Sequence, residues 1–148
     1  MVERVIEIAA PREFCFEVIA DFESYPEFLK TISAVTTTKK AENVIAEFKV
    51  FIVKTISYSL DFRMSKPERM DWSLVKGDMM EKNSGAWILE VISPQLTKCT
   101  YQIDVEFGWL VPKTIVEILT EVQLPEVMSG FQNRVESLYA SKMKKEKA

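Results

Sequence analysis

The chain has 148 residues, 47% of them hydrophobic, which is enough to build one continuous core, so we expect a single domain over residues 1–148. Nineteen basic and 22 acidic residues give a net charge of −3, which argues against a nucleic-acid partner held through phosphate contacts. The chain has no histidine, which excludes Ser-His-Asp and Cys-His catalysis and the usual histidine-containing metal sites. We therefore expect neither a metal site nor a cofactor.

The sequence predicts a cytoplasmic protein that does not cross a membrane. The opening segment MVERVIEIAA carries charges at Glu3, Arg4 and Glu7, where a signal peptide needs an uninterrupted apolar stretch. The longest apolar runs, VFIV and WLVP, are far shorter than the roughly 18 residues of a membrane span. Cys15 and Cys99 lie in apolar patterns without a CxxC neighbour, so we expect two buried free thiols.

The first part of the chain predicts a short strand and two short helices. The segment ERVIEIAA alternates weakly and then meets Pro11, which suits the first position of a helix. Pro26 then starts a second helical turn, with Ser24 or Tyr25 near its cap. Between the two prolines, apolar residues recur at spacings of three and four and predict one buried stripe: Phe14, Cys15, Val18, Ile19 and Phe22.

The middle of the chain has a period of two, which predicts five or six antiparallel strands with one apolar face each. The segments TISYSLDFRM and KCTYQIDVEF alternate without a break, so their apolar residues share one face and their polar residues the other. Three shorter faces follow the same rule: Val44, Ala46, Phe48, Val50 and Ile52; Met70, Trp72 and Leu74; Trp87, Leu89 and Val91. Turns are expected near residues 39–43, 53–55, 66–68, 76–78 and 93–97.

From Pro112 the helical period returns and predicts one long helix that closes the chain. Pro125 removes a backbone donor, so we expect a kink or a break at that residue. The basic tail from Lys142, KMKKEKA, complements the dipole at a helix end, and contact with a membrane surface or RNA are the alternatives. Helices over the one apolar face of a twisted antiparallel sheet make an α+β fold.

In this order the elements resemble the START-like (SRPBCC) superfamily of helix-grip proteins, in its polyketide cyclase/dehydrase and Coq10-type branch. Four segments carry the resemblance, which covers essentially the whole chain: AAPREFCFEVIADFESYPEFL, YSLDFRM, SGAWILEV and MSGFQNRVESLY. It implies a Bet v 1-like fold, in which a curved antiparallel sheet of six to seven strands wraps a long C-terminal helix, with two short helices after the first strand.

The resemblance also gives a role to DFESYPEFLK, residues 21–30, as a clasp that bridges the open edge of the sheet. Tyr25 and Phe28 would hold this clasp and Pro26 would fix its turn. The alternative, an acid–base pair of Asp21 and Glu23, specifies no partner group, whereas a carboxylate near a helix end has an ordinary capping role.

Between sheet and final helix the resemblance implies a cavity for an apolar ligand, although a solid core would show the same aromatic face. Large aromatic residues with a few polar groups suit the wall of a small-molecule pocket. We expect this wall to be formed by Phe48, Tyr58, Phe62, Trp72, Trp87, Tyr101, Ile103, Leu119, Met128 and Phe131.

Trp109, Leu110 and Val111 are consecutive apolar residues at a strand-to-helix junction, where a turn is normally polar. Four arrangements would explain them. They could form a lid over the cavity, a dimer contact or a transient membrane-surface contact, or they could pack under the first helix or the loop after Asp78.

Three functions are consistent with these features. The first is binding, transport or chaperoning of a hydrophobic small molecule, lipid-like or isoprenoid-quinone-like, by a monomer or weak dimer without catalytic residues. The second is a polyketide cyclase- or dehydratase-like enzyme, with Tyr58 and Tyr101 moving protons. The third, a ribosome-associated interaction protein, would need a basic face, and only the tail supplies one.

Overall fold

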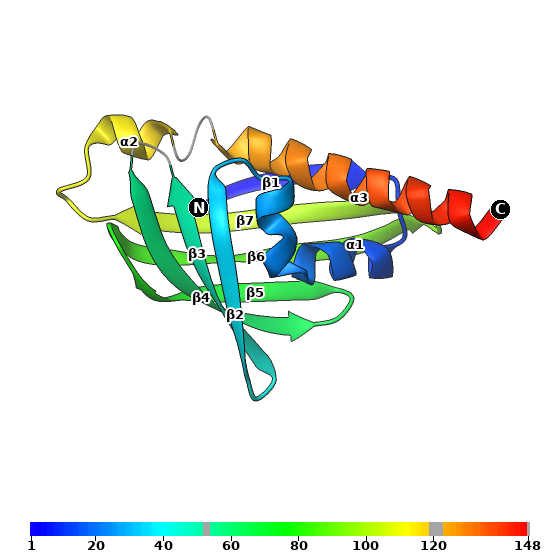
Figure 1. The fold of residues 1–148 in the computed structure, drawn as a ribbon, viewed down its shortest axis with the longest axis horizontal. Helices are drawn as coiled ribbons and strands as arrows, with labels where there is room; N and C mark the ends of the chain where they lie inside the picture. Colours follow the sequence, from blue (N-terminus) through cyan, green and yellow to red (C-terminus); the bar gives the residue numbers. More distant parts are fainter. Residues whose placement is uncertain (52–53, 119–122, 148) are drawn as a thin grey trace.

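A computed structural model describes residues 1–51, 54–118 and 123–147, and within them one seven-stranded antiparallel sheet forms the body of the protein (Figure 1). The strands lie in the spatial order β1-β7-β6-β5-β4-β3-β2, so β1 and β2 are the edges. Their bounds are β1 Val2–Ile8, β2 Ile32–Lys40, β3 Asn43–Phe51, β4 Thr55–Ser65, β5 Arg69–Gly77, β6 Met80–Ser93 and β7 Leu96–Phe107.

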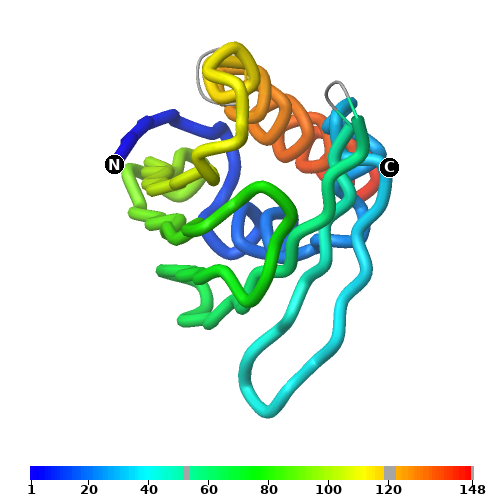
Figure 2. The backbone as a smooth tube through the Cα atoms, turned by 90° about the vertical axis from the view of Figure 1, so that its left-hand side faces the viewer, coloured from blue at the N-terminus to red at the C-terminus, as the bar shows by residue number. Residues whose placement is uncertain are grey.

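Four helices accompany the sheet in the described ranges: α1 Arg12–Ala20, the 3-10 helix η1 Phe22–Glu27, α2 Lys113–Glu117 and α3 Gln123–Lys147. Figure 2 shows the sheet curving so that its two edge strands lie on either side of α3. The predicted helix-grip architecture is therefore confirmed, with seven strands and two short helices after β1.

The alternation of apolar residues places the strands' inner face as predicted, with buried side chains that include Phe48, Leu60 and Trp87. Three predictions of exposure are wrong, one of them for Thr100, which is buried although it was expected on the polar face of its strand. Val91 is 55% exposed, because the covered face of β6 ends at Leu89 and residues 90–95 are all exposed. Ser59 is buried although it was expected outside, at a bulge in the pairing of β4 with β5.

The helix boundaries differ from the predicted ones at three prolines. Pro11 is the extended residue before α1, so the helix begins one residue later than expected. Pro26 lies inside η1, which begins at Phe22. The predicted break at Pro125 is not seen, since Pro125 lies inside α3 near its described start at Gln123, where a missing N–H leaves no helical bond unmade; residues 119–122, before α3, lie outside the described residues.

Hydrogen bonds hold α3 and α1 in place over the sheet. The Glu136 carboxylate on α3 accepts from the backbone N–H of Ala9, at 2.9 Å, between β1 and α1. The Thr97 hydroxyl of β7 donates to the carbonyl of Ala10, at 2.7 Å. Since all these groups meet where β1 passes into α1, this junction fixes both helices relative to the strands.

The clasp, residues 21–30, fastens β2 and α3 to each other through its side chains. The buried ring of Tyr25 contacts Phe131 of α3 with centroids 5.1 Å apart, and its hydroxyl donates to the carbonyl of Ile19. The Glu23 carboxylate accepts from the Thr37 hydroxyl and backbone N–H of β2, at 2.6 and 3.0 Å, and these bonds lower the pKa of Glu23. This carboxylate is thus engaged in holding the structure.

Candidate functional site

A cavity of about 230 Å³ lies between the curved sheet and the first turns of α3. β7 contributes the largest share of its wall, and the α3 side is formed by Leu124 and Val127. Most lining side chains are apolar, and the polar ones stand at separate points of the wall: Thr31, Tyr58, Asn83, Tyr101, Asp104 and Gln123. The cavity is therefore an apolar space with a few hydrogen-bonding groups.

Tyr58 and Tyr101 are the two phenols of this cavity, and both are held rigidly by ring contacts. Tyr58 stacks on Phe48 with centroids 5.3 Å apart, and Tyr101 packs against Trp87 at 4.8 Å and Trp72 at 5.5 Å. Neither hydroxyl has a hydrogen-bond partner within the part of the chain that the structure describes. The apolar wall therefore carries two hydroxyl groups that have no hydrogen-bond partner among the described residues.

Both phenols are protonated at neutral pH, and burial moves their pKa values still further from it. Burial raises the pKa of Tyr58 to about 12. Burial, together with the nearby Tyr58, raises the pKa of Tyr101 well above its ordinary value. Each group can therefore donate a hydrogen bond to a ligand oxygen, and neither can act as a base near pH 7.

Asn83 is a cavity residue that the sequence analysis missed. It is buried on β6, where its side-chain oxygen accepts from the indole N–H of Trp72 at 3.1 Å. Among the described residues, its amide nitrogen has only the Met80 sulfur, at 3.8 Å, as a weak acceptor. Asn83 shares its strand face with Trp87 and Leu89, so a polar residue on an apolar face was the signal in the sequence.

The residues predicted to line a cavity divide into three groups. Tyr58, Tyr101 and Ile103 line it. Leu119 lies outside the described residues. The other six are buried in the core beside the cavity, where their rings and side chains fill the space: Phe48, Phe62, Trp72, Trp87, Met128 and Phe131.

The segment Trp109 to Val111 forms a turn between β7 and α2, closed by the Val111 N–H bonding to the Gly108 carbonyl at 3.0 Å. Trp109 is 88% exposed and Leu110 is 76% exposed, so the expectation that these two residues pack under another part of the chain is wrong. Phe107, immediately before the turn, lines the cavity. The exposed turn is therefore adjacent to the cavity wall.

Other kinds of site receive no support from the residues described. They contain no group of three or more Cys, Asp or Glu side chains placed to hold a metal ion. No helix among them is long and apolar enough to span a bilayer. Cys15 and Cys99 are both buried and unpaired.

Comparison with known proteins places the chain in a family. The profile described as "Polyketide cyclase / dehydrase and lipid transport" matches residues 8–132. The chain belongs to this family. Members of the polyketide cyclase/dehydrase and lipid transport family bind or act on hydrophobic molecules. The family description does not determine which ligand this member binds.

Solved structures share the fold of this family member at low sequence identity. A START superfamily protein from Mycobacterium smegmatis has a TM-score of 0.80 at 22% identity, covering 93% of this chain and 97% of the other. The Zhui aromatase/cyclase from Streptomyces sp. R1128 has a TM-score of 0.81 at 13% identity, covering 91% and 92%. A protein from Thermus thermophilus has a TM-score of 0.81 at 14% identity, covering 93% and 97%. A search of curated proteins finds no match.

Proposed function

We propose that the protein is a cytoplasmic carrier, a monomer or weak dimer, that binds a small hydrophobic molecule in the cavity between the sheet and α3. The observation that carries this proposal is the pair of unpaired phenol hydroxyls, Tyr58 and Tyr101, in an otherwise apolar wall. Both hydroxyls are free to donate within the described residues, so a ligand oxygen would supply the acceptor that the apolar wall lacks.

The size and chemistry of the cavity limit the class of ligand. A volume of 230 Å³ is below the range of roughly 300–1,000 Å³ that is usual for pockets of drug-sized ligands. It suits a compact ring or the head of a longer lipid. A quinone carbonyl can accept a hydrogen bond from a phenol hydroxyl, so an isoprenoid-quinone-like or lipid-like ligand suits a wall that offers Tyr58 and Tyr101 as donors.

The exposed turn at Trp109 and Leu110 supports a transient contact with a lipid surface during loading. Both residues are largely exposed, Lys113 follows them, and an aromatic ring beside a cation suits the headgroup region of a membrane. Because Phe107 lies at the cavity wall, a molecule leaving the bilayer at this turn would meet the cavity at once.

An enzyme that polarises a carbonyl, such as a polyketide cyclase, would use the same two phenols as donors. Such an enzyme also needs a base to remove a proton from carbon. The carboxylate at this cavity, Asp104, is bound to Lys82 at 2.7 Å, and this bond lowers the pKa of Asp104. The two tyrosine donors and the engaged Asp104 carboxylate therefore fit a binding site better than the active site of a cyclase.

The first experiment is native mass spectrometry of the freshly purified protein, followed by solvent extraction of any bound molecule. A second experiment measures the affinity for a quinone with a short isoprenoid tail. The double variant Tyr58→Phe/Tyr101→Phe keeps both rings and should weaken binding about tenfold or more, since each lost hydrogen bond contributes about 1 kcal/mol.

Tyr139→Phe is the matched control, because Tyr139 packs on Phe14 outside the cavity and should leave the affinity unchanged. Equal affinities for the wild type and the double variant would contradict the proposal. So would a protein that carries no extractable molecule and shows no thermal shift with quinones, fatty acids or other lipids. Turnover of a polyketide-like substrate that depends on the two tyrosines would favour the enzyme.

A further inference from the structure

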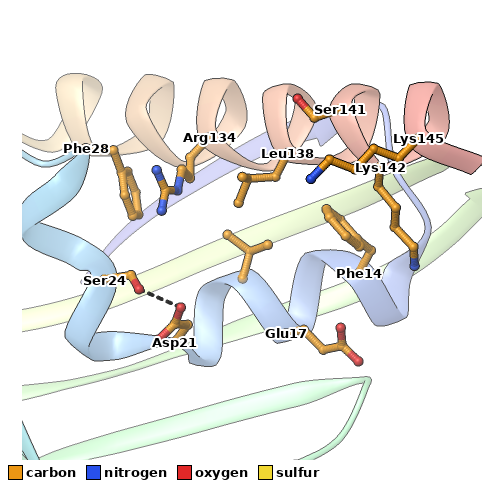
Figure 3. Close-up of a pocket in the computed structure, with 11 residues that line it drawn as sticks. Phe14, Glu17, Asp21, Ser24, Phe28, Arg134, Leu138, Ser141, Lys142 and Lys145 are labelled. Atoms are coloured by element: carbon orange, nitrogen blue, oxygen red, sulfur yellow. Dashed lines mark hydrogen bonds between the residues drawn. The ribbon is translucent and has the colours of Figure 1, made fainter.

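A second hollow, separate from the cavity, runs along the outside of the molecule between α1 and the C-terminal half of α3 (Figure 3). This α1–α3 groove has a volume of about 440 Å³, nearly twice that of the cavity. Its apolar surface comes from Phe14 and Val18 of α1, Leu138 of α3 and Phe28 of the clasp. The groove lies within the size range of a site for one small molecule.

The apolar strip of the groove is not covered by any other segment that the structure describes. Phe14 and Val18 belong to the stripe that the sequence predicted to be buried, yet both are only half-buried. Leu138 is 37% exposed. Phe14 is held by an edge-on contact with Tyr139, with centroids 5.3 Å apart, so the strip is a rigid surface rather than a gap closed by a small side-chain movement.

Positive charge that has no ion-pair partner is concentrated at one end of the groove. Lys142 lies with its ammonium 5.5 Å from the centre of the Phe14 ring. Neither Lys142 nor Lys145 forms an ion pair with any residue that the structure describes. Both line the groove, and Figure 3 shows them together beside Phe14.

The other charged groups of the groove are already engaged. Arg134 forms an ion pair with Glu27 at 2.8 Å and stacks over Phe28. Glu17 is within 3.7 Å of Lys66. Asp21 accepts from the Ser24 hydroxyl at 2.6 Å and lies at the opposite end from the two lysines. The groove is therefore polarised, cationic at the Lys142 end and closed by Asp21 at the other.

We propose that the α1–α3 groove is a second binding site, specific for a single-chain amphiphile with an anionic head, such as a fatty acid. The carboxylate binds Lys142 and Lys145, and the alkyl chain lies along Val18 and Leu138 toward Phe28. Arg134 and Lys142 are eight helical steps apart, a rise of about 12 Å along α3, which matches an alkyl chain of medium length.

The dimensions favour a small molecule over a protein partner. Stable protein interfaces bury about 1,200 Å² or more of total surface and are broad, whereas this groove is narrow and lies between two helices. A cation at one end and an apolar strip along the rest match the head and tail of one amphiphile. The Asp21 carboxylate at the far end would repel an anionic head, so it disfavours an amphiphile bound in the opposite direction.

The test is titration calorimetry of the intact protein with monomeric dodecanoate and with dodecanol, which has the same chain without the charge. The variant Lys142→Gln/Lys145→Gln should weaken dodecanoate binding about tenfold and leave dodecanol binding nearly unchanged, because only the charged head contacts the lysines. The control Lys144→Gln/Lys147→Gln removes the same charge from the same helix end, outside the groove, and should have no effect.

Two further measurements separate this site from the cavity. Leu138→Asp should abolish dodecanoate binding, while Tyr58→Phe/Tyr101→Phe should leave it intact. Loss of dodecanoate binding in the tyrosine variant but not in the lysine variant would place the anion in the cavity and overturn the proposal. A lysine variant that changes only adsorption to anionic vesicles, with dodecanoate binding unaltered, would also overturn it and assign the lysines to a membrane surface.

Discussion

Gly85 of β6 shows how a single residue fixes the wall of the cavity. It pairs with Trp72 on one side and Ile103 on the other. A Cβ atom at this position would lie 2.1 Å from the backbone carbonyl of Gln102 and 2.5 Å from the ring of Trp72. The absence of a side chain therefore lets the Trp72 ring lie flat against the sheet, where its N–H reaches Asn83.

We expect Gly85→Ala to destabilise the protein by about 3 kcal/mol, because the backbone of Gln102 cannot move aside and the Trp72 ring must leave its site. Urea unfolding measures the change. Gly108→Ala is the control, since its Cβ would meet nothing closer than 3.8 Å, and it should be nearly neutral. Equal stabilities of the two variants would show that the sheet accommodates the methyl group.

The turn between β7 and α2 is expected to affect membrane binding through its exposed side chains and to have little effect on the stability of the fold. Since Trp109 and Leu110 contribute almost nothing to the core, changing both to Ser should leave stability unaltered. We expect the double variant to bind lipid vesicles at least tenfold more weakly, since each large apolar side chain contributes about 1.5–3 kcal/mol when it is fully buried and about 1.4 kcal/mol already corresponds to a factor of ten. Val75→Ser is the control, because Val75 is an apolar residue that is 54% exposed but lies on β5. Unchanged vesicle binding would remove the membrane contact from the proposed function.

The strands could be predicted from sequence because their side chains alternate between two environments, as in β4, where Ile56, Leu60 and Phe62 are buried. Helix boundaries were less predictable. Pro125 is accepted near the described start of α3 and would be unfavourable a turn later, and the local sequence allows both positions. Val91 is exposed because the covered face of β6 ends at Leu89, and no local pattern contains how far the rest of the molecule covers a strand.

At the scale of the whole molecule, the sequence indicated which side chains face α3 but not how much space they leave. Alternation gives the direction of a side chain and says nothing about what fills the space opposite. Phe22 of η1 lies 4.2 Å from Phe62 between ring centroids, and Phe131 of α3 lies 5.3 Å from Trp87. These rings arrive from distant parts of the chain, and they turn most of the predicted cavity wall into solid core.

The reaction of the two cysteines with a thiol reagent measures how often this core opens. Cys15 on α1 and Cys99 on β7 are fully buried, and the hydrogen bond to Cys15, together with burial, raises the pKa of Cys99. A thiol reagent can therefore reach them only after α1 separates from the sheet. Whether that separation is local or requires unfolding of the whole domain determines how labelling responds to a ligand.

We expect the separation to be global, because α1 is tied to the sheet through the same junction, at Ala9 and Ala10, that ties α3. A ligand in the cavity then stabilises the folded state by about 2.7 kcal/mol at one hundred times its dissociation constant. Labelling of both thiols by an aromatic disulfide should slow by about one hundredfold under those conditions, measured by absorbance with a saturating short-chain quinone. If labelling of Cys15 keeps its rate while a thermal shift proves that the ligand is bound, α1 opens on its own and the domain does not act as one cooperative unit.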